Sequence, residues 1–424
     1  MASCISSAPH LAAICPWEGA ADMYRDLSHH GGILCDFIKN WYDMQVRTVQ
    51  YGLGKRGPKS RVTGKPVCGD IELSDAELLE NRENFAQSAL KHTMDDSYWR
   101  ARMPDWSKVT VPIFSSANWG GQGLHPRGNF EGFTRAASKE KWLEVHGIEH
   151  WTHFYTDYGR ELQLKFFDYF LHGKKNGWNR QPKVLLNIRH PGEKFVKRSE
   201  DEWPLKKTRW TRFYLQTDAA TLSTKPPLQS GKISYKGFSE GATFMLPPQT
   251  NDLEITGPIA VKLFLSSSTT DADVFAVLRV FTPDLQEVVF QGALDPHTPI
   301  GQGWLRASHR KLDSLSKPYR PYHTHDEKQP LKPNQQVELD IEIIPTSIVV
   351  PAGYRLALSL RGKDYVYPGP AGVLSNMKYP MTGCGPFTHT DSKDRPARIF
   401  DGVNTIHISP KKAPYILLPV IPKS

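Results

Sequence analysis

Cysteine is scarce in this chain of 424 residues, and the spacing of its five cysteines excludes the common cysteine-built sites. They are Cys4, Cys15, Cys35, Cys68 and Cys384, an odd number with no Cys-x-x-Cys pair. Disulfide frameworks use even sets of cysteines, and structural zinc sites use closely spaced pairs. His323 and His325 bring no further ligand residues with them, so they read as solvated side chains. The sequence therefore predicts no disulfide scaffold, no metal site and no cofactor.

Long apolar runs are also missing from the sequence. No stretch approaches the roughly 20 apolar residues that a membrane-spanning helix needs. The residues from Met1 to Ser7 carry none of the basic side chains that open a signal peptide. We therefore expect no membrane partner and a cytoplasmic location.

Basic residues outnumber acidic ones, 53 to 44, but they do not gather into a patch. Nucleic-acid binding needs clustered basic residues interleaved with aromatics, so the net charge of +9 does not predict it. The glycine-rich stretch 118–128 matches neither of the glycine motifs that bind nucleotide phosphates. Its glycines predict a tight turn instead.

The chain is too long for a single core, and its pattern changes near residue 181. Before that point, strands at 109–116 and 141–145 alternate with helices, which is typical of a parallel sheet. Residues 24–105 read as short helices inserted between strands, as in a cap. Beyond 181, alternating strands such as 337–343 predict an all-β sandwich of the jelly-roll type. The expected fold class is α/β plus all-β, with domains at 1–180 (helical cap at about 24–105) and 181–424.

The stretch Lys141–Phe154 combines a strand, a glycine turn and two histidines. The strand breaks at Gly147, His150 and His153 follow on either side of Trp151, and an amphipathic helix begins near residue 158. An open α/β sheet presents catalytic side chains at the carboxyl ends of its strands, where such turns lie. The alternative interpretation is two ordinary, partly buried loop histidines.

Several short motifs follow one another along the chain. They are Pro9–Gly19, Asp96–Arg102, Val111–Phe114 with Trp119, Lys141–His153, Phe166–Gly173 and Trp203-Pro204, then Gly257-Pro258, Asp271–Asp273 and Ala352–Leu356. In this order they resemble the X-Pro dipeptidyl-peptidases and cocaine-esterase-like serine hydrolases, and the resemblance covers nearly the whole chain. It implies a partial α/β-hydrolase domain with a helical cap, followed by a jelly-roll β-sandwich.

The resemblance also implies a reaction and its residues. The family cleaves a small-molecule ester or X-Pro peptide by acyl transfer through a Ser–His–Asp triad. Its histidine closes a Gly-Pro-Trp-x-His turn, which His153 matches best, with His150 as the second candidate base. The family's acid follows a Gly-Trp turn, but Gly121 stands at that place here. The neighbouring carboxylates are Glu131, Glu149 and Asp157, and Glu131 is the first candidate because the other two share the histidines' own turn.

The nucleophile is the part of the triad that the sequence does not supply. In the family it lies in a Gly-x-Ser-Tyr-x-Gly elbow before the Pro9 segment, a place upstream of Met1. Ser3, Ser6 and Ser7 lack flanking glycines and are not expected to replace it. We therefore expect an amino-terminally truncated chain that is catalytically inactive as given.

Two functions follow from that expectation. One is a hydrolase whose nucleophile segment is missing from this chain. The other is an inactive, shortened paralogue that acts as a binding or interaction module through the sandwich. In the second case Trp203, Trp210 and Trp304 are candidate stacking platforms for a glycan, although core packing is their commoner role.

A substrate pocket is expected near the amino-terminal strand and the histidine turn. Four aromatic side chains are candidates for lining an acyl pocket: Trp17, Tyr24, Trp119 and Trp151. Glu18 or Asp22 would meet the free amine of a peptide substrate, or would instead pair with Arg25. The sequence leaves the oligomeric state open.

Overall fold

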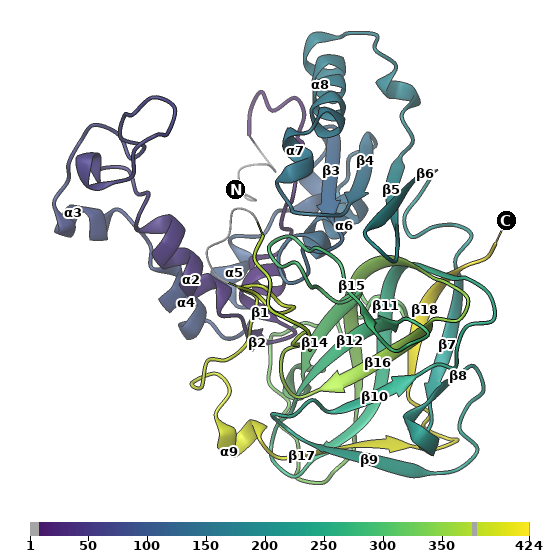
Figure 1. The fold of residues 1–424 in the computed structure, drawn as a ribbon. Helices are drawn as coiled ribbons and strands as arrows, with labels where there is room; N and C mark the ends of the chain where they lie inside the picture. Colours follow the sequence, from purple (N-terminus) through teal and green to yellow (C-terminus); the bar gives the residue numbers. More distant parts are fainter. Residues whose placement is uncertain (1–7, 375–379, 424) are drawn as a thin grey trace.

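The computed structural model describes residues 8–374 and 380–423. Cys4 and the amino-terminal serines Ser3, Ser6 and Ser7 lie outside the described residues. The chain forms an α/β part, an arm of short helices and a β-sandwich below them (Figure 1). No helix among the described residues is both long enough and apolar enough to cross a bilayer.

The α/β part is a four-stranded sheet in the order β3-β4-β5-β6. Strands β3 (Ile113–Asn118), β4 (Lys141–His146) and β5 (Val184–His190) run parallel, and β6 (Lys194–Glu200) returns antiparallel to β5. Ile14 and Trp17 form parallel bridges to the free side of β3, so the segment before Glu18 continues the sheet. Helix α6 (Pro126–Arg135) links β3 to β4, and α7 (Thr152–Tyr155) and α8 (Asp157–His172) follow β4. The predicted strand–helix–strand–helix order is confirmed.

The boundary of this sheet differs from the boundary drawn at residue 181. The strand predicted there is β5, and it pairs with β4 rather than with the sandwich, carrying β6 with it. A short apolar run suits a buried parallel strand as well as a sandwich strand, so its composition does not decide between them. The α/β sheet therefore extends to Glu200.

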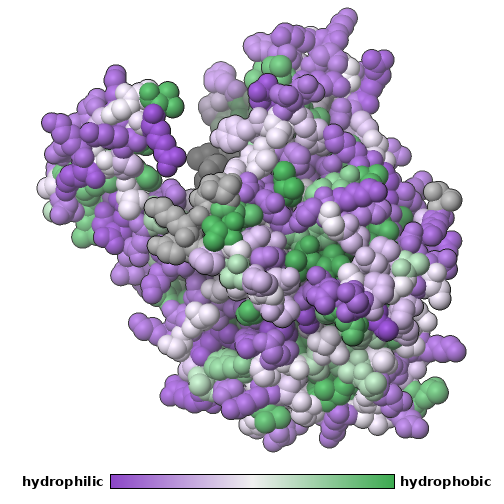
Figure 2. All heavy atoms as spheres, viewed as in Figure 1, coloured by the Kyte–Doolittle hydropathy of each residue, from purple (hydrophilic) through white to green (hydrophobic). Residues whose placement is uncertain are grey.

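The segment between the first bridge and β3 holds short helical turns, as predicted, and one hairpin that was not predicted. Its elements are η1 (Tyr24–Ser28), β1 (His29–His30), β2 (Ile33–Leu34), α2 (Phe37–Trp41), η2 (Tyr42–Val46), η3 (Gly54–Arg56), α3 (Asp75–Glu80), α4 (Phe85–Lys91), α5 (Ser97–Arg100) and η4 (Trp106–Lys108). The part around α3 projects away from the body as an arm, and its visible surface is mostly hydrophilic (Figures 1 and 2).

The β1–β2 hairpin lies directly against the sandwich. Gly31 turns it with φ +56°, and a Cβ there would lie 2.0 Å from the carbonyl oxygen of Trp304. The hairpin backbone also receives a hydrogen bond, from the amide of Arg306 to Gly31 O, at 2.9 Å. Only glycine permits both the positive φ and this close approach.

The sandwich consists of two antiparallel sheets. Its elements are β7 (Arg209–Leu215), η6 (Asp218–Ala220), β8 (Leu222–Ser223), β9 (Gly231–Lys236), β10 (Ala242–Met245), β11 (Leu253–Ser267), β12 (Asp273–Phe281), β13 (Glu287–Val288), β14 (Gly301–Arg306), η7 (Ala307–His309), β15 (Val337–Val350), β16 (Arg355–Arg361), α9 (Ala397–Phe400), β17 (Val403–Ile408) and β18 (Tyr415–Ile421); η5 (Trp178–Arg180) precedes β5. One sheet has the order β8-β7-β18-β11-β17-β9, with β15 also on β11. The other has β10-β16-β12-β13, with β14 also on β12.

Alternating side chains build the core between these sheets. Leu339, Ile341 and Ile343 of β15 are fully buried, whereas Lys262 of β11 reaches Asp340 on the other face of the same sheet. This is the period-two pattern of a half-buried strand, and it confirms the predicted sandwich. The solvated interpretation of His323 and His325 is wrong, because both lie buried under the hairpin side of the sandwich.

Candidate functional site

A buried histidine lies between two glutamates at the carboxyl end of β4. Glu144 and His146 are two residues apart on the strand, so their side chains share a face. The imidazole Nδ1 of His146 lies 2.8 Å from Glu144 Oε2, and its Nε2 lies 3.2 Å from Glu18 Oε1. His146 and Glu144 have no exposed surface. The site thus holds three ionisable groups in contact and shielded from water.

The electrostatics of this cluster favour an imidazolium ion. Burial by itself lowers the pKa of His146, but the charge of Glu144 and the hydrogen bonds to both glutamates outweigh it and raise the pKa to about 9. Burial is also the largest influence on Glu144, yet His146 and the hydrogen bonds hold the pKa of that carboxyl below its usual value. Burial raises the pKa of Glu18 to about 7. At neutral pH the cluster therefore contains His146 as a cation and Glu144 as an anion.

Glu144 is held by three neutral donors besides the histidine. The Ser116 hydroxyl donates to Glu144 Oε2 at 2.6 Å, and Tyr158 Oη and Asn187 Nδ2 donate to Oε1 at 3.0 and 3.1 Å. Ser116 lies opposite Glu144 in the register of β3 and β4 and is fully buried. Because its hydroxyl is already donated to a carboxylate and no solvent reaches it, this Ser–His–Glu set is not a nucleophilic triad.

His153 and His150 lie above this cluster, on the turn after Gly147. The ring centroid of His153 is 5.0 Å from that of His146, and the ring of His150 is 5.7 Å from that of His125. Burial and the neighbouring charge of His146 lower the pKa of both His150 and His153 to about 4. Both are therefore neutral at pH 7 and have a lone pair with which to accept a proton.

The backbone around His153 is fixed by a close approach. A Cβ on Gly159 would lie 1.8 Å from His153 O, and the Thr156 hydroxyl donates to the same carbonyl at 3.0 Å. Within the described residues, Nδ1 of His150 and Nδ1 of His153 have no hydrogen-bond partner. The turn thus holds two neutral, half-buried imidazoles in place without a carboxylate on either.

The other predicted catalytic residue lies elsewhere. The carboxylate of Glu131 accepts a hydrogen bond from Arg320 at 2.9 Å and lies 3.8 Å from Arg135, so both of its described ion pairs are with arginines. It lies on α6, which packs against the sandwich strand β15. The structure therefore does not bring Glu131 to the candidate bases, and the carboxylates that contact His146 are Glu18 and Glu144.

The predicted pocket residues separate into two groups. Trp17 packs on His146 with ring centroids 5.4 Å apart, Glu18 contacts the same ring, and Trp151 stands edge-on to His150 at 4.3 Å. Trp119 instead lies in the core, fully buried, with its indole N–H donating to Asn187 O at 2.8 Å. Trp119 cannot line a pocket from that position.

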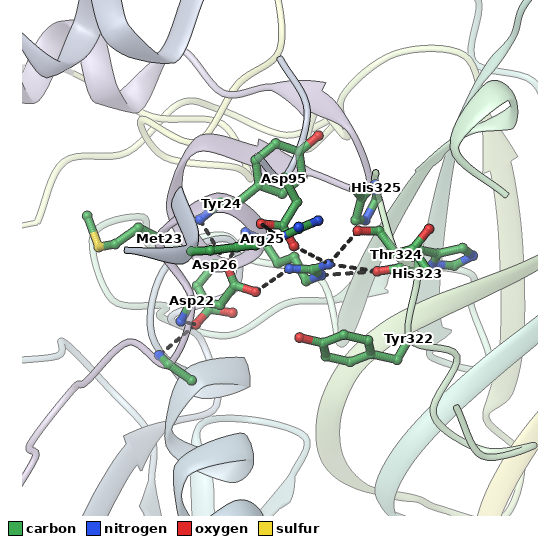
Figure 3. Close-up of polar contacts among 12 residues, drawn as sticks. Asp22, Met23, Tyr24, Arg25, Asp26, Asp95, Tyr322, His323, Thr324 and His325 are labelled. Atoms are coloured by element: carbon green, nitrogen blue, oxygen red, sulfur yellow. Dashed lines mark hydrogen bonds and ion pairs between the residues drawn. The ribbon is translucent and has the colours of Figure 1, made fainter. Parts of the chain in front are cut away.

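Asp22 and Tyr24 also belong to packing rather than to the site. Arg25 donates to Asp22 Oδ2 at 2.5 Å, forms an ion pair with Asp95 at 2.9 Å and donates to the carbonyls of His323 and Thr324 (Figure 3). Tyr24 is fully buried. Of the two interpretations of Asp22, pairing with Arg25 is the one that the structure supports.

One Gly-x-Ser-x-Gly string occurs at 237–241, and it is not a nucleophile elbow. It forms the turn between β9 and β10 in the sandwich, where the Ser239 hydroxyl donates to Lys236 O at 2.6 Å. A nucleophile elbow joins a strand to a helix. The string therefore carries no catalytic meaning here.

Sequence reasoning missed Glu144 and His146. A signal for them was present, because a glutamate and a histidine two residues apart in an otherwise apolar strand must point to the same face. The predicted strand at 141–145 contains Glu144 and ends one residue before His146, the last residue of β4.

Two family models match the chain. Residues 3–155 match the X-Pro dipeptidyl-peptidase (S15 family) model, and residues 176–416 match the X-Pro dipeptidyl-peptidase C-terminal non-catalytic domain. Among curated relatives, a candidate serine esterase of Mycobacterium bovis is 27% identical over 247 residues, 49% of this chain and 36% of that protein. Cocaine esterase of a Rhodococcus species is 22% identical over 302 residues, 61% of this chain and 45% of the esterase. The chain thus spans less than half the length of these two relatives.

Solved structures agree with the family models. A CocE/NonD family hydrolase from Staphylococcus aureus superposes with a TM-score of 0.81 at 27% identity, covering 98% of this chain and 69% of the hydrolase. An α-amino acid ester hydrolase has a TM-score of 0.63 at 15% identity, over 98% of this chain and 74% of its own, a likeness of fold alone. The chain belongs to the family of X-Pro dipeptidyl-peptidases and CocE/NonD hydrolases.

Proposed function

We propose that this chain belongs to a serine hydrolase of the α/β-hydrolase class. In that enzyme it contributes the catalytic base and the charged residues around it. The β3–β6 sheet would be the later part of that hydrolase domain, residues 24–105 its cap, and the sandwich a jelly roll. The observation that carries the proposal is the neutral His153, held over the buried His146–Glu144 pair at the carboxyl end of β4.

In this proposal His153 accepts the proton of a serine hydroxyl while the serine oxygen attacks the substrate carbonyl. It returns that proton to the leaving alcohol or amine, and water then repeats the sequence to release the acid. His146 remains an imidazolium throughout, and its charge keeps His153 in the neutral form that a base requires. His150 is the second candidate for the same role.

We propose an ester as the substrate ahead of an X-Pro peptide. A dipeptidyl-peptidase needs a carboxylate for the free amine of its substrate, and Glu18 and Asp22 were the two candidates. Glu18 contacts His146 and Asp22 contacts Arg25. Each carboxylate already faces a buried cation of the protein, and the esterase names of two relatives agree with an ester.

Active-site labelling tests the proposal. We expect a fluorophosphonate probe to label the protein isolated from its own cells, and to leave the 424-residue chain expressed alone unlabelled. The physical reason is that Ser116, whose hydroxyl lies 3.5 Å from His146 Nδ1, is buried and hydrogen-bonded to Glu144. Labelling at any serine between residues 8 and 374 would contradict this assignment, and mass spectrometry of the labelled peptide decides it.

Substitution of the two histidines tests the identity of the base. In the labelled protein, His153→Gln is expected to lower kcat by about 10³-fold or more, because the nucleophile then has no proton acceptor. His150→Gln on the same turn is the matched control and is expected to change kcat by less than about 10-fold. The reverse order would identify His150 as the base.

The pH dependence of kcat/KM gives an independent check. The base works when it is deprotonated, and the pKa of His153 is lowered to about 4. Activity should therefore hold as the pH falls from 7 to 5 and decline only near pH 4. An acid limb centred near pH 6.5, the usual value for histidine, would show that the base is not in this environment.

A further inference from the structure

Two buried histidines from distant parts of the chain face each other across the contact between hairpin and sandwich. His30 lies on β1 and His389 in the loop before α9, 359 positions later. His30 Nδ1 lies 2.9 Å from His389 Nε2. Both side chains are almost fully buried.

On each ring, the nitrogen that faces away from the other histidine has its own hydrogen-bond partner. These partners determine which ring nitrogen carries the proton. His30 Nε2 lies 3.3 Å from the carbonyl oxygen of Asp26, which can only accept, so this nitrogen carries the N–H. His389 Nδ1 lies 2.7 Å from Asp364 Oδ1. A carboxylate oxygen accepts, so His389 Nδ1 carries the N–H that it donates to Asp364.

The two facing nitrogens are therefore both lone pairs when the rings are neutral. Lone pairs of two nitrogens 2.9 Å apart repel each other unless a cation lies between them. That cation is either a proton on one of the rings or a metal ion.

A third ligand distinguishes these options. The Sγ of Cys35 and the two histidine nitrogens all lie within 4.8 Å of one another. Cys35 follows β2 and has 1% of its surface exposed. Two imidazoles and a thiolate are ligands that Zn²⁺ prefers, and a carboxylate on the far nitrogen of a ligand histidine commonly orients it, as Asp364 does for His389.

We propose that His30, Cys35 and His389 form a Zn²⁺ site that joins the β1–β2 hairpin to the sandwich. Zinc bonds of about 2.0–2.1 Å to nitrogen and about 2.3 Å to sulfur require donor separations of roughly 3.4–3.6 Å in a tetrahedral site. The facing nitrogens, now 2.9 Å apart, must then move apart by about half an ångström. Asp364 acts as a positioning residue.

Access and charge balance are consistent with such a site. A cavity of about 460 Å³ is lined by His389 and Asp364, so open space lies beside one of the three ligands and its positioning carboxylate. Zinc binds a thiolate, so the ion must displace the proton of the Cys35 thiol. Binding therefore releases one proton, and the affinity should fall as the pH falls.

The zinc site would reinforce an existing contact between the residues after β2 and the loop before α9. The backbone of Asp36, next to Cys35, donates to Thr388 O at 2.8 Å, and its carboxylate accepts from Thr388 and Thr390. A zinc ion on the two adjoining residues would cross-link the same loops. Sequence spacing alone does not reveal the site, because only His30 and Cys35 are close together and His389 lies 359 positions beyond His30.

Metal binding to the purified 424-residue chain tests the inference. After treatment with a chelator, we expect one Co²⁺ per chain, with the near-ultraviolet absorption of a thiolate-to-cobalt transition. Zn²⁺ at about 100 times its Kd should raise the melting temperature by a few degrees. Cys35→Ser should abolish both effects, whereas Cys384→Ser, at a buried cysteine lining the same cavity, should keep both. Asp364→Asn should weaken the affinity about 10- to 100-fold.

X-ray absorption of the zinc-loaded wild-type chain keeps the test valid if Cys35→Ser does not fold. One sulfur and two imidazole nitrogens in the first shell are expected. A shell of oxygen atoms only would overturn the proposal, as would metal uptake below about a tenth of an ion per chain at saturation, or a thiolate absorption that survives in Cys35→Ser.

Discussion

Replacing His146 with leucine is expected to lower the free energy of unfolding by about 3–5 kcal/mol, because it removes one partner from a buried ion cluster. The substitution fills much of the same volume, so a cavity contributes little. It leaves Glu144 and Glu18 buried without the cation between them. Urea unfolding at pH 7 measures the difference.

His146 should also make the free energy of unfolding of the wild-type protein depend on pH. The pKa of His146 is raised from 6.5 to about 9 by its glutamates. A raised pKa stabilises the folded state fully below pH 6.5, and that contribution is lost as the pH rises through 9. The raised pKa of Glu18 acts in the same direction, since a buried carboxyl that prefers its proton costs stability above pH 4.5. The loss from His146 is about 3 kcal/mol, and it should be absent in His146→Leu.

A matched control separates the cluster from a general effect of losing a histidine. His172, at the exposed end of α8, has no ion pair among the described residues. His172→Leu is expected to change the free energy of unfolding by less than about 0.5 kcal/mol. If His146→Leu cost no more than His172→Leu, the imidazolium between the two glutamates would be disproved.

Replacing Arg25 with methionine is the second substitution for which we expect a large loss, again about 3–5 kcal/mol. Its guanidinium joins Asp22 and Asp95 to the carbonyls of His323 and Thr324, which come from a sandwich loop (Figure 3). Methionine keeps the apolar stem but leaves two buried carboxylates and two carbonyls without their donor. Faster hydrogen exchange in the loop around residue 324 should accompany the loss.

Arg47 offers the control for Arg25. It pairs with Asp43 at 2.9 Å, but both side chains are more than half exposed. An exposed pair contributes roughly 0–1 kcal/mol, so Arg47→Met should be close to neutral. Equal effects at the two arginines would mean that the buried network does not hold the sandwich loop in place.

Much of the fold was predictable because it follows from local periodicity. The stripe of apolar residues from Leu162 to Leu171 predicted α8, and the alternation from Val337 to Ile343 predicted β15. The β1–β2 hairpin has two residues in each strand, too few to show a period. Its position depends on Gly31 fitting against Trp304, a contact between residues far apart in sequence.

The site was predictable only in part, because burial of charge is decided by tertiary packing. The motif led to His153 and His150, and the structure places both beside the candidate cluster. It did not lead to the pairing of Glu18 with His146, because these residues are far apart in the sequence and only the fold brings them together. Glu131 was selected by its closeness in sequence, and its charge proved to be engaged by arginines across the contact with the sandwich.

The β1–β2 hairpin has a consequence for the synthesis of the protein. Its side chains Ile33 and His30 are covered by sandwich residues that leave the ribosome much later, as the 359 positions between His30 and His389 indicate. At roughly 5–20 residues per second, the hairpin waits on the order of 20–70 s for that surface. During translation the hairpin therefore lacks the surface on which it packs. Its apolar side chains stay exposed on the nascent chain until the later half has folded.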